Sequence, residues 1–598
     1  MQTKRTSAGR YRPFRPIIVT DRSWPDNTIT SAPRWLSTDL RDGNQSLAAP
    51  MTPERKLAMF ELLVGMGYRE IEVGFPVASQ DDHDFLRVLI EQDRIPDDVR
   101  ISVLVQARDE LIRRTVESLE GAPRATIHLY NATSPLFRRV VFDMSRDECK
   151  DLAVRGTQLM MKYAERTLRD CDLGFQYSPE LFNDTEADFS LEVCEAVMDV
   201  WQPEPGREII LNFPTTVERS LPNVFADQIE WLHRNLSRRE HVCLSIHPHN
   251  DRGTGVASSE LALLAGADRI EGCLFGNGER AGNVCLVTLG LNMLTHGVDP
   301  GIDFSDINTV RRVVEDCNGI AVHPRHPYGG DLVHTSFAGS HQDAIKKGFD
   351  ALERRAAEEG VPVGELPWEM PYLPIDPADL GRTYEAVVRI NSQSGKGGVA
   401  YIMSAWYGLS LPRDLQVDFA KVVQSRADAD GEEITPSRVR RLFEDEYMTD
   451  SAVPLPRGEQ PVRTSLYIDG GGFDVGAARA DSIQSVRSVL TARGFEVRAV
   501  HRTGLATARP GTGRSDVAVY AECVMDGRVF WGAGLEADVE AASVAAVRSA
   551  VVRATLARLP VVSTGVAPAG LRAGRSPSEA ADSGSIRNRS ERNLASYV

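Results

Sequence analysis

The stretch Val242-Cys243-Leu244-Ser245-Ile246-His247-Pro248-His249 places two histidines at the end of an apolar run. The run is partly β-branched and predicts a buried strand. Residues two apart on a strand point to the same side, so both imidazole rings can face one point. Neutral imidazole is a common metal ligand, and a bound ion needs such convergence. An isolated His-x-His motif more often makes ordinary hydrogen bonds, so the interpretation depends on the rest of the chain.

Strand-like runs recur before and after this stretch and alternate with helix-like segments. The expected strands are Trp35–Asp39, Glu70–Val73, Ile101–Val105, Ala125–Tyr130, Leu173–Tyr177, Glu208–Asn212, Val242–His247 and Arg269–Phe275. The expected helices are Pro53–Gly67, Asp81–Glu91, Asp109–Leu119, Asp147–Leu168, Glu186–Val200, Val224–Asn235, Val256–Ala265 and Val284–Thr295. Such alternation requires a parallel sheet, and eight units in succession predict an α/β fold with a closed (β/α)₈ barrel. A doubly wound open sheet is the alternative.

Polar side chains lie at the ends of most of these strands. They are Arg41, Asp42, His128, Tyr130, Ser178, Glu180, Asn212, Thr216, His247, His249, Asn277, Glu279 and Asn283. In a barrel these ends line one shared mouth. Asp42 is the candidate third ligand beside His247 and His249, because the first and seventh strands both flank the eighth. Three protein ligands with open positions are typical of a catalytic metal site. Arg41 is expected over the same mouth, with a surface salt bridge as its alternative role.

The composition changes after residue 325. We expect an N-terminal extension at 1–34, the barrel at 35–325, a helical subdomain near its mouth at 326–430, a linker with a short helix at 431–460, a small α+β domain at 461–560 and a disordered tail at 561–598. Met525-Asp526-Gly527-Arg528 is a good hairpin turn within the α+β domain. The tail is rich in Gly, Ser, Ala, Pro and Arg, a composition that rarely builds a core.

Bulk properties exclude several classes of protein. A chain of 598 residues is long enough for two or three domains. The formal net charge of −16 argues against a general surface for nucleic acid or anionic membranes. There is no apolar run of about 18 residues, and the basic start lacks the apolar core of a secretory signal. Eight scattered cysteines without a CxxC pair indicate free thiols in a reducing cytoplasm.

Three segments at strand ends carry a resemblance. Leu40-Arg41-Asp42-Gly43-Asn44-Gln45 follows the first strand, His247-Pro248-His249-Asn250-Asp251 the seventh, and Gly276-Asn277-Gly278-Glu279-Arg280-Ala281-Gly282-Asn283 the eighth. Together they resemble the 2-isopropylmalate synthase family of metal-dependent acyl-CoA–2-oxo acid aldolases, over residues 15–425. Asn391-Ser392-Gln393-Ser394-Gly395-Lys396-Gly397-Gly398 and His326-Pro327-Tyr328-Gly329-Gly330-Asp331 are similar to its longer, actinobacterial-type members. Homocitrate and citramalate synthases share the Arg-Asp and His-x-His elements, and a barrel-derived regulatory protein without catalysis is a further alternative.

The resemblance implies a Claisen-type condensation. Acetyl-CoA, 3-methyl-2-oxobutanoate and water would give (2S)-2-isopropylmalate and CoA, the first committed step of leucine biosynthesis. It also implies that Asp42, His247 and His249 bind a divalent metal, with Asn283 as a further ligand or neighbour. Mg²⁺ is the expected metal, and Mn²⁺ and Zn²⁺ are the alternatives.

The remaining catalytic groups follow from the same resemblance. Arg41 would stabilise the alkoxide that develops on the ketone oxygen. The base that removes a proton from the acetyl methyl group is one of Glu180, His341 and Tyr372. His341 and Tyr372 lie after the barrel and are expected to reach the site across a homodimer.

Substrate contacts are expected from two groups of residues. The oxo-acid pocket would be built from Leu104, His128, Tyr130, Ser178, Asn212, Pro214 and Thr216. It contains no Arg or Lys, which argues against a dicarboxylic oxo acid, although Leu104 and Tyr130 are equally explained as barrel core. Gly276, Asn277, Gly278, Glu279 and Arg280 would form the acetyl-CoA loop, because glycines let backbone N–H groups approach a phosphate. A tight loop that simply needs small residues is the alternative.

Residues 461–560 match the position of the family's leucine-binding regulatory domain. Gly470, Gly472, Gly532 and Gly534 are the candidate regulatory residues. The family's Gly-x-Gly-Asn-Gly-Pro loop is replaced here by Gly470-Gly471-Gly472-Phe473-Asp474-Val475, whereas Trp531-Gly532-Ala533-Gly534 fits the family. We therefore expect a folded domain with weakened or altered leucine inhibition. The alternative is a domain kept only for dimer packing.

Overall fold

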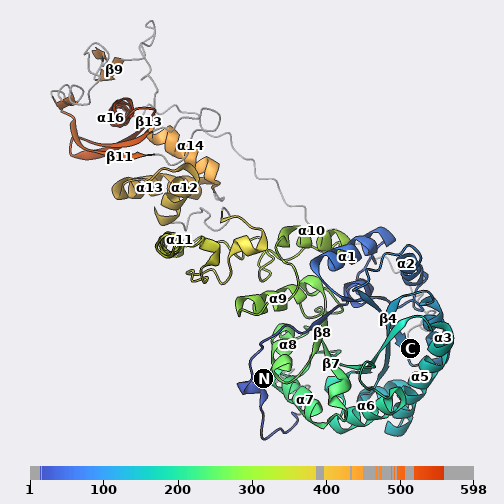
Figure 1. The fold of residues 1–598 in the computed structure, drawn as a ribbon. Helices are drawn as coiled ribbons and strands as arrows, with labels where there is room; N and C mark the ends of the chain where they lie inside the picture. Colours follow the sequence, from blue (N-terminus) through green and yellow to red (C-terminus); the bar gives the residue numbers. More distant parts are fainter. Residues whose placement is uncertain are drawn as a thin grey trace, which may run out of the picture. The chain divides into compact units, whose positions relative to one another are not determined.

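A closed barrel of eight parallel strands forms the first part of the chain (Figure 1). The computed structural model describes residues 14, 16–384, 396–430, 434–448, 465–468, 471–474, 487, 490–491, 494–504 and 517–557. The barrel strands are β1 (Arg34–Ser37), β2 (Glu70–Gly74), β3 (Arg100–Gln106), β4 (Arg124–Ala132), β5 (Asp172–Glu180), β6 (Ile209–Thr215), β7 (Val242–Pro248) and β8 (Arg269–Gly272). Strand β8 closes the ring by pairing with β1, from Arg34 opposite Arg269 to Ser37 opposite Gly272. The (β/α)₈ prediction is confirmed, and the open sheet is excluded.

The helices around the barrel lie within two residues of their predicted positions. They are α1 (Pro53–Met66), α2 (Gln80–Glu91), α3 (Asp109–Ser118), α5 (Arg146–Thr167), α6 (Ala187–Trp201), α7 (Pro222–Asn235), α8 (Gly255–Leu264) and α9 (Leu286–Thr295). Helix α1 illustrates the local signals. The Thr52 side chain accepts the Arg55 N–H, Pro53 fills the first helical position, and Gly67 at φ 106° ends the helix.

Two local features shape the mouth. A π-helical turn, η3 (Asp39–Gly43), directly follows β1 and carries Arg41 and Asp42. Strand β8 ends at Gly272, so the predicted continuation to Phe275 is wrong. A Cβ at Gly272 would lie 2.7 Å from the Val284 carbonyl oxygen, because the returning chain crosses there. The next residues form the turn η7 (Leu274–Gly276) instead of a strand.

One hydrophobic core joins the strands to the surrounding helices. Phe175 packs on Trp201 and Phe182 on Phe213, with ring centroids 5.1 and 4.8 Å apart. The N-terminal extension is tied to this body, because Arg22 donates two hydrogen bonds to Asp227 of α7, at 2.6 and 2.7 Å.

The barrel interior also contains charged groups, which need partners when they are buried. Glu72, Arg269 and Glu271 are fully buried there.

Helices dominate the chain between the barrel and residue 448. They are α10 (Ile307–Asn318), α11 (Gly339–Glu359), α12 (Lys396–Tyr407), α13 (Arg413–Asp430) and α14 (Pro436–Tyr447). Shorter helical turns are η2 (Trp24–Asp26), α4 (Pro135–Phe137), η4 (Arg138–Phe142), η5 (Phe182–Asp184), η6 (Arg239–His241), η8 (Val363–Glu365) and η9 (Pro377–Leu380). Phe349 of α11 contacts the rings of Trp368, Tyr384 and Tyr401. No helix in the described part of the chain has the length and apolarity needed to cross a membrane.

The chain divides into two compact units, Met1–Asp445 with Leu505–Ser515, and Glu446–Gly504 with Asp516–Val598. The second unit contains the antiparallel pair β9 (Ser465–Ile468) and β10 (Gly471–Asp474). It also contains the antiparallel sheet β11 (Glu496–Gly504), β12 (Val517–Met525) and β13 (Arg528–Glu536), followed by α16 (Val539–Leu556). The predicted hairpin joins β12 and β13, with Asp526 at φ 50° and Gly527 at φ 73°. Residue 470 and the tail at 561–598 lie outside the described residues.

Candidate active site

Asp42, His247 and His249 converge at the barrel mouth. Asp42 follows β1, His247 lies in β7, and His249 follows that strand. The Asp42 Oδ2 lies 3.6 Å from His247 Nε2 and 3.8 Å from His249 Nε2. The two rings stack with centroids 5.2 Å apart, and one donor atom from each of the three residues lies within 4.8 Å of the others. All three are buried, so a single ion placed among them would be shielded from bulk water.

The charges of these groups suit a divalent cation. Burial alone would raise the pKa of Asp42, but Arg41 and the two histidines hold it well below its usual range, as a carboxylate. Burial and the neighbouring His247 lower the pKa of His249 to about 3, so this ring is neutral. Burial opposes charge on His247 as well, yet the carboxylates of Asp42 and Glu271 raise its pKa to about 9. The Asp42 carboxylate and the neutral His249 ring thus offer lone pairs to a divalent cation, and such an ion would take the place of the proton on His247.

Asn283 completes this cluster. Its Nδ2 donates to Asp42 Oδ2 at 2.6 Å and to the Asn277 carbonyl at 3.0 Å. Its Oδ1 lies 2.8 Å from His247 Nε2. The amide oxygen thus faces the same point as the three candidate ligands, in keeping with the position predicted for it.

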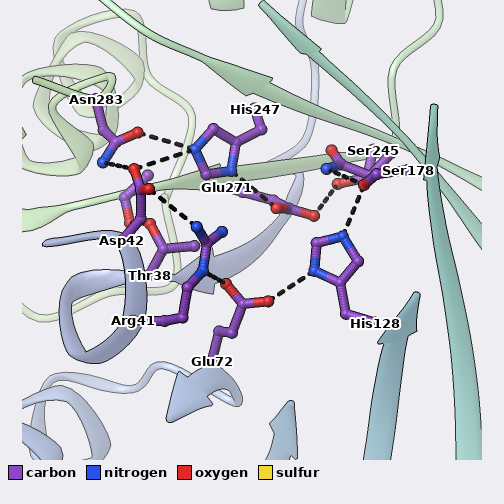
Figure 2. Close-up of polar contacts among 12 residues, drawn as sticks. Thr38, Arg41, Asp42, Glu72, His128, Ser178, Ser245, His247, Glu271 and Asn283 are labelled. Atoms are coloured by element: carbon purple, nitrogen blue, oxygen red, sulfur yellow. Dashed lines mark hydrogen bonds and ion pairs between the residues drawn. The ribbon is translucent and has the colours of Figure 1, made fainter. Parts of the chain in front are cut away.

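Arg41 is buried beside Asp42 and is not a surface salt bridge. Its side chain is only 10% exposed, its Nη1 donates to Asp42 Oδ1 at 2.9 Å, and its Nε pairs with Glu72. Glu72 comes from β2 and also bonds His128 Nδ1 at 2.6 Å. Figure 2 shows that these contacts place the guanidinium between two carboxylates. Arg41 is therefore held in one orientation at the mouth.

The polar network continues into the predicted oxo-acid pocket (Figure 2). His128 Nε2 lies 2.7 Å from Ser178 Oγ, which also accepts a hydrogen bond from Asn212 Nδ2 at 2.9 Å. Leu104 is in register with His128 of this network, and Pro214 is in register with His247 of the Asp42 cluster. Leu104 is 7% exposed and Pro214 is buried.

Tyr130 and Thr216 are the two remaining residues predicted for this pocket. Tyr130 is partly buried. The Thr216 hydroxyl accepts the Leu181 N–H at 3.0 Å and holds the loop after β5.

Glu180 ends β5 and has the electrostatics of a base near neutral pH. Burial raises the pKa of its carboxyl to about 6, while the charge of Arg41 acts in the opposite direction. A carboxylate of this pKa is mostly ionised at pH 7 and still takes up a proton readily.

Two family models match the chain. The model described as HMGL-like matches residues 32–314, and the model described as alpha-isopropylmalate synthase, post-catalytic domain-like, matches residues 331–404. A 2-isopropylmalate synthase of Streptosporangium roseum is 80% identical over 562 residues, which cover 94% of this chain and 97% of that protein. One of Thermobifida fusca is 59% identical over 91% of this chain and 97% of its own length. The chain belongs to the 2-isopropylmalate synthase family. Among solved structures, an HMG-CoA lyase from Pseudomonas aeruginosa covers 49% of this chain and 95% of its own, at 17% identity and a TM-score of 0.40.

The family resemblance also assigned catalytic candidates beyond the barrel. His341 and Tyr372 stack on each other, with ring centroids 4.0 Å apart and planes inclined by 22°. His341 is exposed and Tyr372 is 60% exposed. Within the described residues no hydrogen bond or ion pair links them to the Asp42 cluster. Their predicted catalytic role stays a prediction.

The glycine-rich loop after β8 is tight for a structural reason. A Cβ at Gly278 would lie 2.3 Å from Asn283 Nδ2, and one at Gly282 would lie 2.0 Å from the Gly276 carbonyl oxygen. Asn277 Nδ2 donates to the Gly43 carbonyl at 3.0 Å, which ties the loop to η3.

The two charged residues of this loop, Glu279 and Arg280, differ in their surroundings. The Arg280 Nε pairs with Asp251 Oδ1 at 2.7 Å. Glu279 is partly buried. Close packing thus accounts for the glycines, and binding of acetyl-CoA by this loop stays a prediction.

Packing likewise accounts for two of the regulatory glycines. A Cβ at Gly532 would lie 2.1 Å from the Ala546 carbonyl oxygen, and one at Gly534 would lie 2.0 Å from that of Ala542. These glycines let α16 approach β13 closely. Gly472 lies in β10 and Gly470 lies outside the described residues. Leucine binding by these residues stays a prediction.

Two buried carboxylates of the site, Glu72 and Glu271, are not among the residues predicted from the sequence. Glu72 holds Arg41 and His128, and Glu271 lies 3.0 Å from His247 Nδ1. A signal was present, because both are acidic residues inside short predicted barrel strands, Glu70-Ile71-Glu72-Val73 and Arg269-Ile270-Glu271-Gly272. A charge that is buried in a barrel strand needs an oppositely charged or hydrogen-bonding partner, so a partner could have been predicted for each of these two residues.

Proposed function

We propose that this chain condenses acetyl-CoA with 3-methyl-2-oxobutanoate and water to give (2S)-2-isopropylmalate and CoA, the first committed step of leucine biosynthesis. The observation that carries the proposal is the buried cluster of Asp42, His247 and His249 beside Arg41, in a chain that is 80% identical to a protein named for this activity. A catalytically inactive barrel is not favoured, because every residue of the motif is retained.

The metal site would be formed by Asp42, His247 and His249, with Asn283 beside them. When bound there, a divalent metal, Mg²⁺ in this proposal, supplies Lewis acidity toward the ketone of the 2-oxo acid. The donor set of one carboxylate and two imidazoles also accepts Mn²⁺ or Zn²⁺. Arg41, fixed by Glu72, would donate to the alkoxide oxygen as its negative charge develops.

Glu180 is our candidate for the base that removes a proton from the acetyl methyl group. Its raised pKa, about 6, and its place at the carboxyl end of β5 support this role. His341 and Tyr372 are the alternatives, and they are expected to reach the site from a second subunit of a homodimer. The oxo-acid side chain would lie against Leu104 and Pro214, where neither residue offers a charge to a second carboxylate.

Leucine is our candidate for an effector that binds the domain formed by residues 461–560. It would act by binding one conformational state of the enzyme more tightly than another. The loop at 470–475 departs from the family pattern, which supports inhibition that is weaker than in the family, or altered.

A thiol-release assay with acetyl-CoA and a panel of 2-oxo acids tests the proposal. We expect the highest kcat/KM with 3-methyl-2-oxobutanoate and slow turnover of its neighbours, since one methylene in an apolar pocket is worth ~1–3 kcal/mol. Leu104→Ala should flatten this ranking while leaving the Asp42 cluster intact. A preference for 2-oxoglutarate or pyruvate would instead assign homocitrate or citramalate synthesis, and no CoA release with any oxo acid would remove the catalytic proposal.

A further inference from the structure

Glu271 lies directly behind His247, inside the barrel (Figure 2). Its Oε2 accepts a hydrogen bond from His247 Nδ1 at 3.0 Å. Its Oε1 accepts from Gln176 Nε2 at 2.7 Å, from Ser245 Oγ at 3.1 Å and from Arg269 Nη1 at 3.0 Å. The side chain is fully buried, and every one of these partners comes from a barrel strand. Such a carboxylate has little freedom to reorient.

Alternating charges continue from Glu271 along the barrel interior. Arg269, itself fully buried, pairs through its Nη1 with Glu271 at 3.0 Å and through its Nε with Glu70 Oε2 at 2.8 Å, and Glu70 pairs with Arg34 at 2.8 Å. The carboxylate behind the His247 ring is therefore held by a buried guanidinium that is itself fixed on its other side.

The two histidines of the cluster differ in the hydrogen bonding of their Nδ1 atoms. His247 Nδ1 faces Glu271, whereas His249 Nδ1 is buried and has no hydrogen-bond partner among the residues that the structure describes. A neutral imidazole carries its proton on one nitrogen only, and a hydrogen bond at the other ring position decides which one binds a metal. In its neutral form His247 therefore keeps its proton on Nδ1 and has a fixed ring plane, whereas no described group orients the His249 ring through its Nδ1.

We propose that Glu271 is a positioning residue of the metal site: by accepting the Nδ1–H of the neutral His247 ring, it leaves the Nε2 lone pair for a bond to the metal and directs that atom toward Asp42. The inference rests on the proposed metal site. Outer carboxylates of this kind also make the imidazole a better ligand, and their loss typically weakens metal affinity by roughly 10–100-fold. The hydrogen bonds from Arg269, Gln176 and Ser245 would in turn hold the Glu271 carboxylate in place.

Metal binding by the full-length protein tests this role. Glu271→Gln keeps the shape and removes the charge, and we expect the Mn²⁺ dissociation constant, measured by calorimetry on the chelated protein, to rise roughly 10–100-fold. The visible absorption spectrum of the Co²⁺-loaded variant should change, because the orientation of one ligand changes. Glu70→Gln is the matched control, since it also removes a carboxylate from Arg269 but does not touch His247. It should leave the Co²⁺ spectrum and the affinity unchanged.

A measurement on the unmodified protein guards against a variant that fails to fold. In the ¹⁵N-histidine spectrum of the metal-loaded enzyme, His247 should carry its proton on Nδ1, with the signal assigned from a His247→Asn spectrum. Wild-type affinity and Co²⁺ spectrum in Glu271→Gln, equal losses in Glu70→Gln, or a proton on Nε2 would each overturn the inference while the metal site stands. Absence of metal binding by the wild type would overturn the metal site as well.

Discussion

Replacing Glu180 by glutamine should stabilise the folded chain at pH 8 and abolish most of its activity. Burial raises the pKa of this carboxyl from 4.5 to about 6, so the folded state binds its proton more tightly than the unfolded state. The contribution of protonated Glu180 to the free energy of unfolding is therefore fully present below pH 4.5, and it is lost as the pH rises through about 6. Glutamine cannot ionise, so the variant escapes this loss.

The magnitude follows from the shift. One pKa unit corresponds to about 1.4 kcal/mol, so a shift of roughly 1.5 units makes ionised Glu180 cost at most about 2 kcal/mol at pH 8. At pH 5 the same relation gives roughly 0.8 kcal/mol. The gain in unfolding free energy for Glu180→Gln should therefore grow by about 1 kcal/mol between pH 5 and pH 8.

Urea unfolding of chelated protein at the two pH values measures this gain. Glu148→Gln is the control of opposite sign, because hydrogen bonds from the Ser145 backbone and side chain lower the pKa of Glu148 at the start of α5. That variant should lose stability at pH 8. A gain for Glu180→Gln that does not increase from pH 5 to pH 8 would show that the carboxylate is not destabilised by burial.

Activity tests the same residue independently. If Glu180 is the base, kcat/KM of the wild type should decline as pH falls through about 6, and Glu180→Gln should lose roughly 10²–10⁴-fold in kcat. His341→Asn and Tyr372→Phe serve as parallel variants. Near-normal kcat in Glu180→Gln together with a collapse in either of the others would move the base to the exposed stacked pair.

Three further outcomes are expected. Asp42→Asn should lower both metal affinity and turnover by orders of magnitude without unfolding the barrel; calorimetry and circular dichroism check this, and full activity after exhaustive chelation would contradict it. Gly282→Ala should reduce activity and thermal stability more than Gly297→Ala, because both have positive φ but only the first would drive its Cβ to 2.0 Å from a carbonyl oxygen. Leucine should inhibit the intact chain weakly and a truncation at residue 460 not at all; strong inhibition at micromolar leucine would contradict the reasoning from the altered loop.

The sequence alone determined the barrel and the composition of its mouth. Alternating periodicity identified eight strands and eight helices, and parallel strands in a closed barrel bring their carboxyl ends together. That topology was enough to predict that Asp42, His247 and His249 meet, although Asp42 and His247 lie far apart along the chain. Whether a residue lies at the end of a strand depends only on its place along the chain, so the sequence pattern is enough to predict it.

Only the tertiary structure decided which side chains hold one another. Strand periodicity says that Glu271 faces the same side of its strand as Arg269, but not that His247 of β7 and Gln176 of β5 meet it there. Likewise, the close approach of Gly278 to Asn283 and of Gly282 to the Gly276 carbonyl, which explains why glycine is needed at both positions, is not visible in the sequence. Buried charges pair, and backbones pack closely, only where segments remote in sequence come within a few ångströms of each other. The energy of both contacts falls steeply as that separation grows. A sequence pattern fixes the order of the groups, whereas the folded barrel fixes these distances.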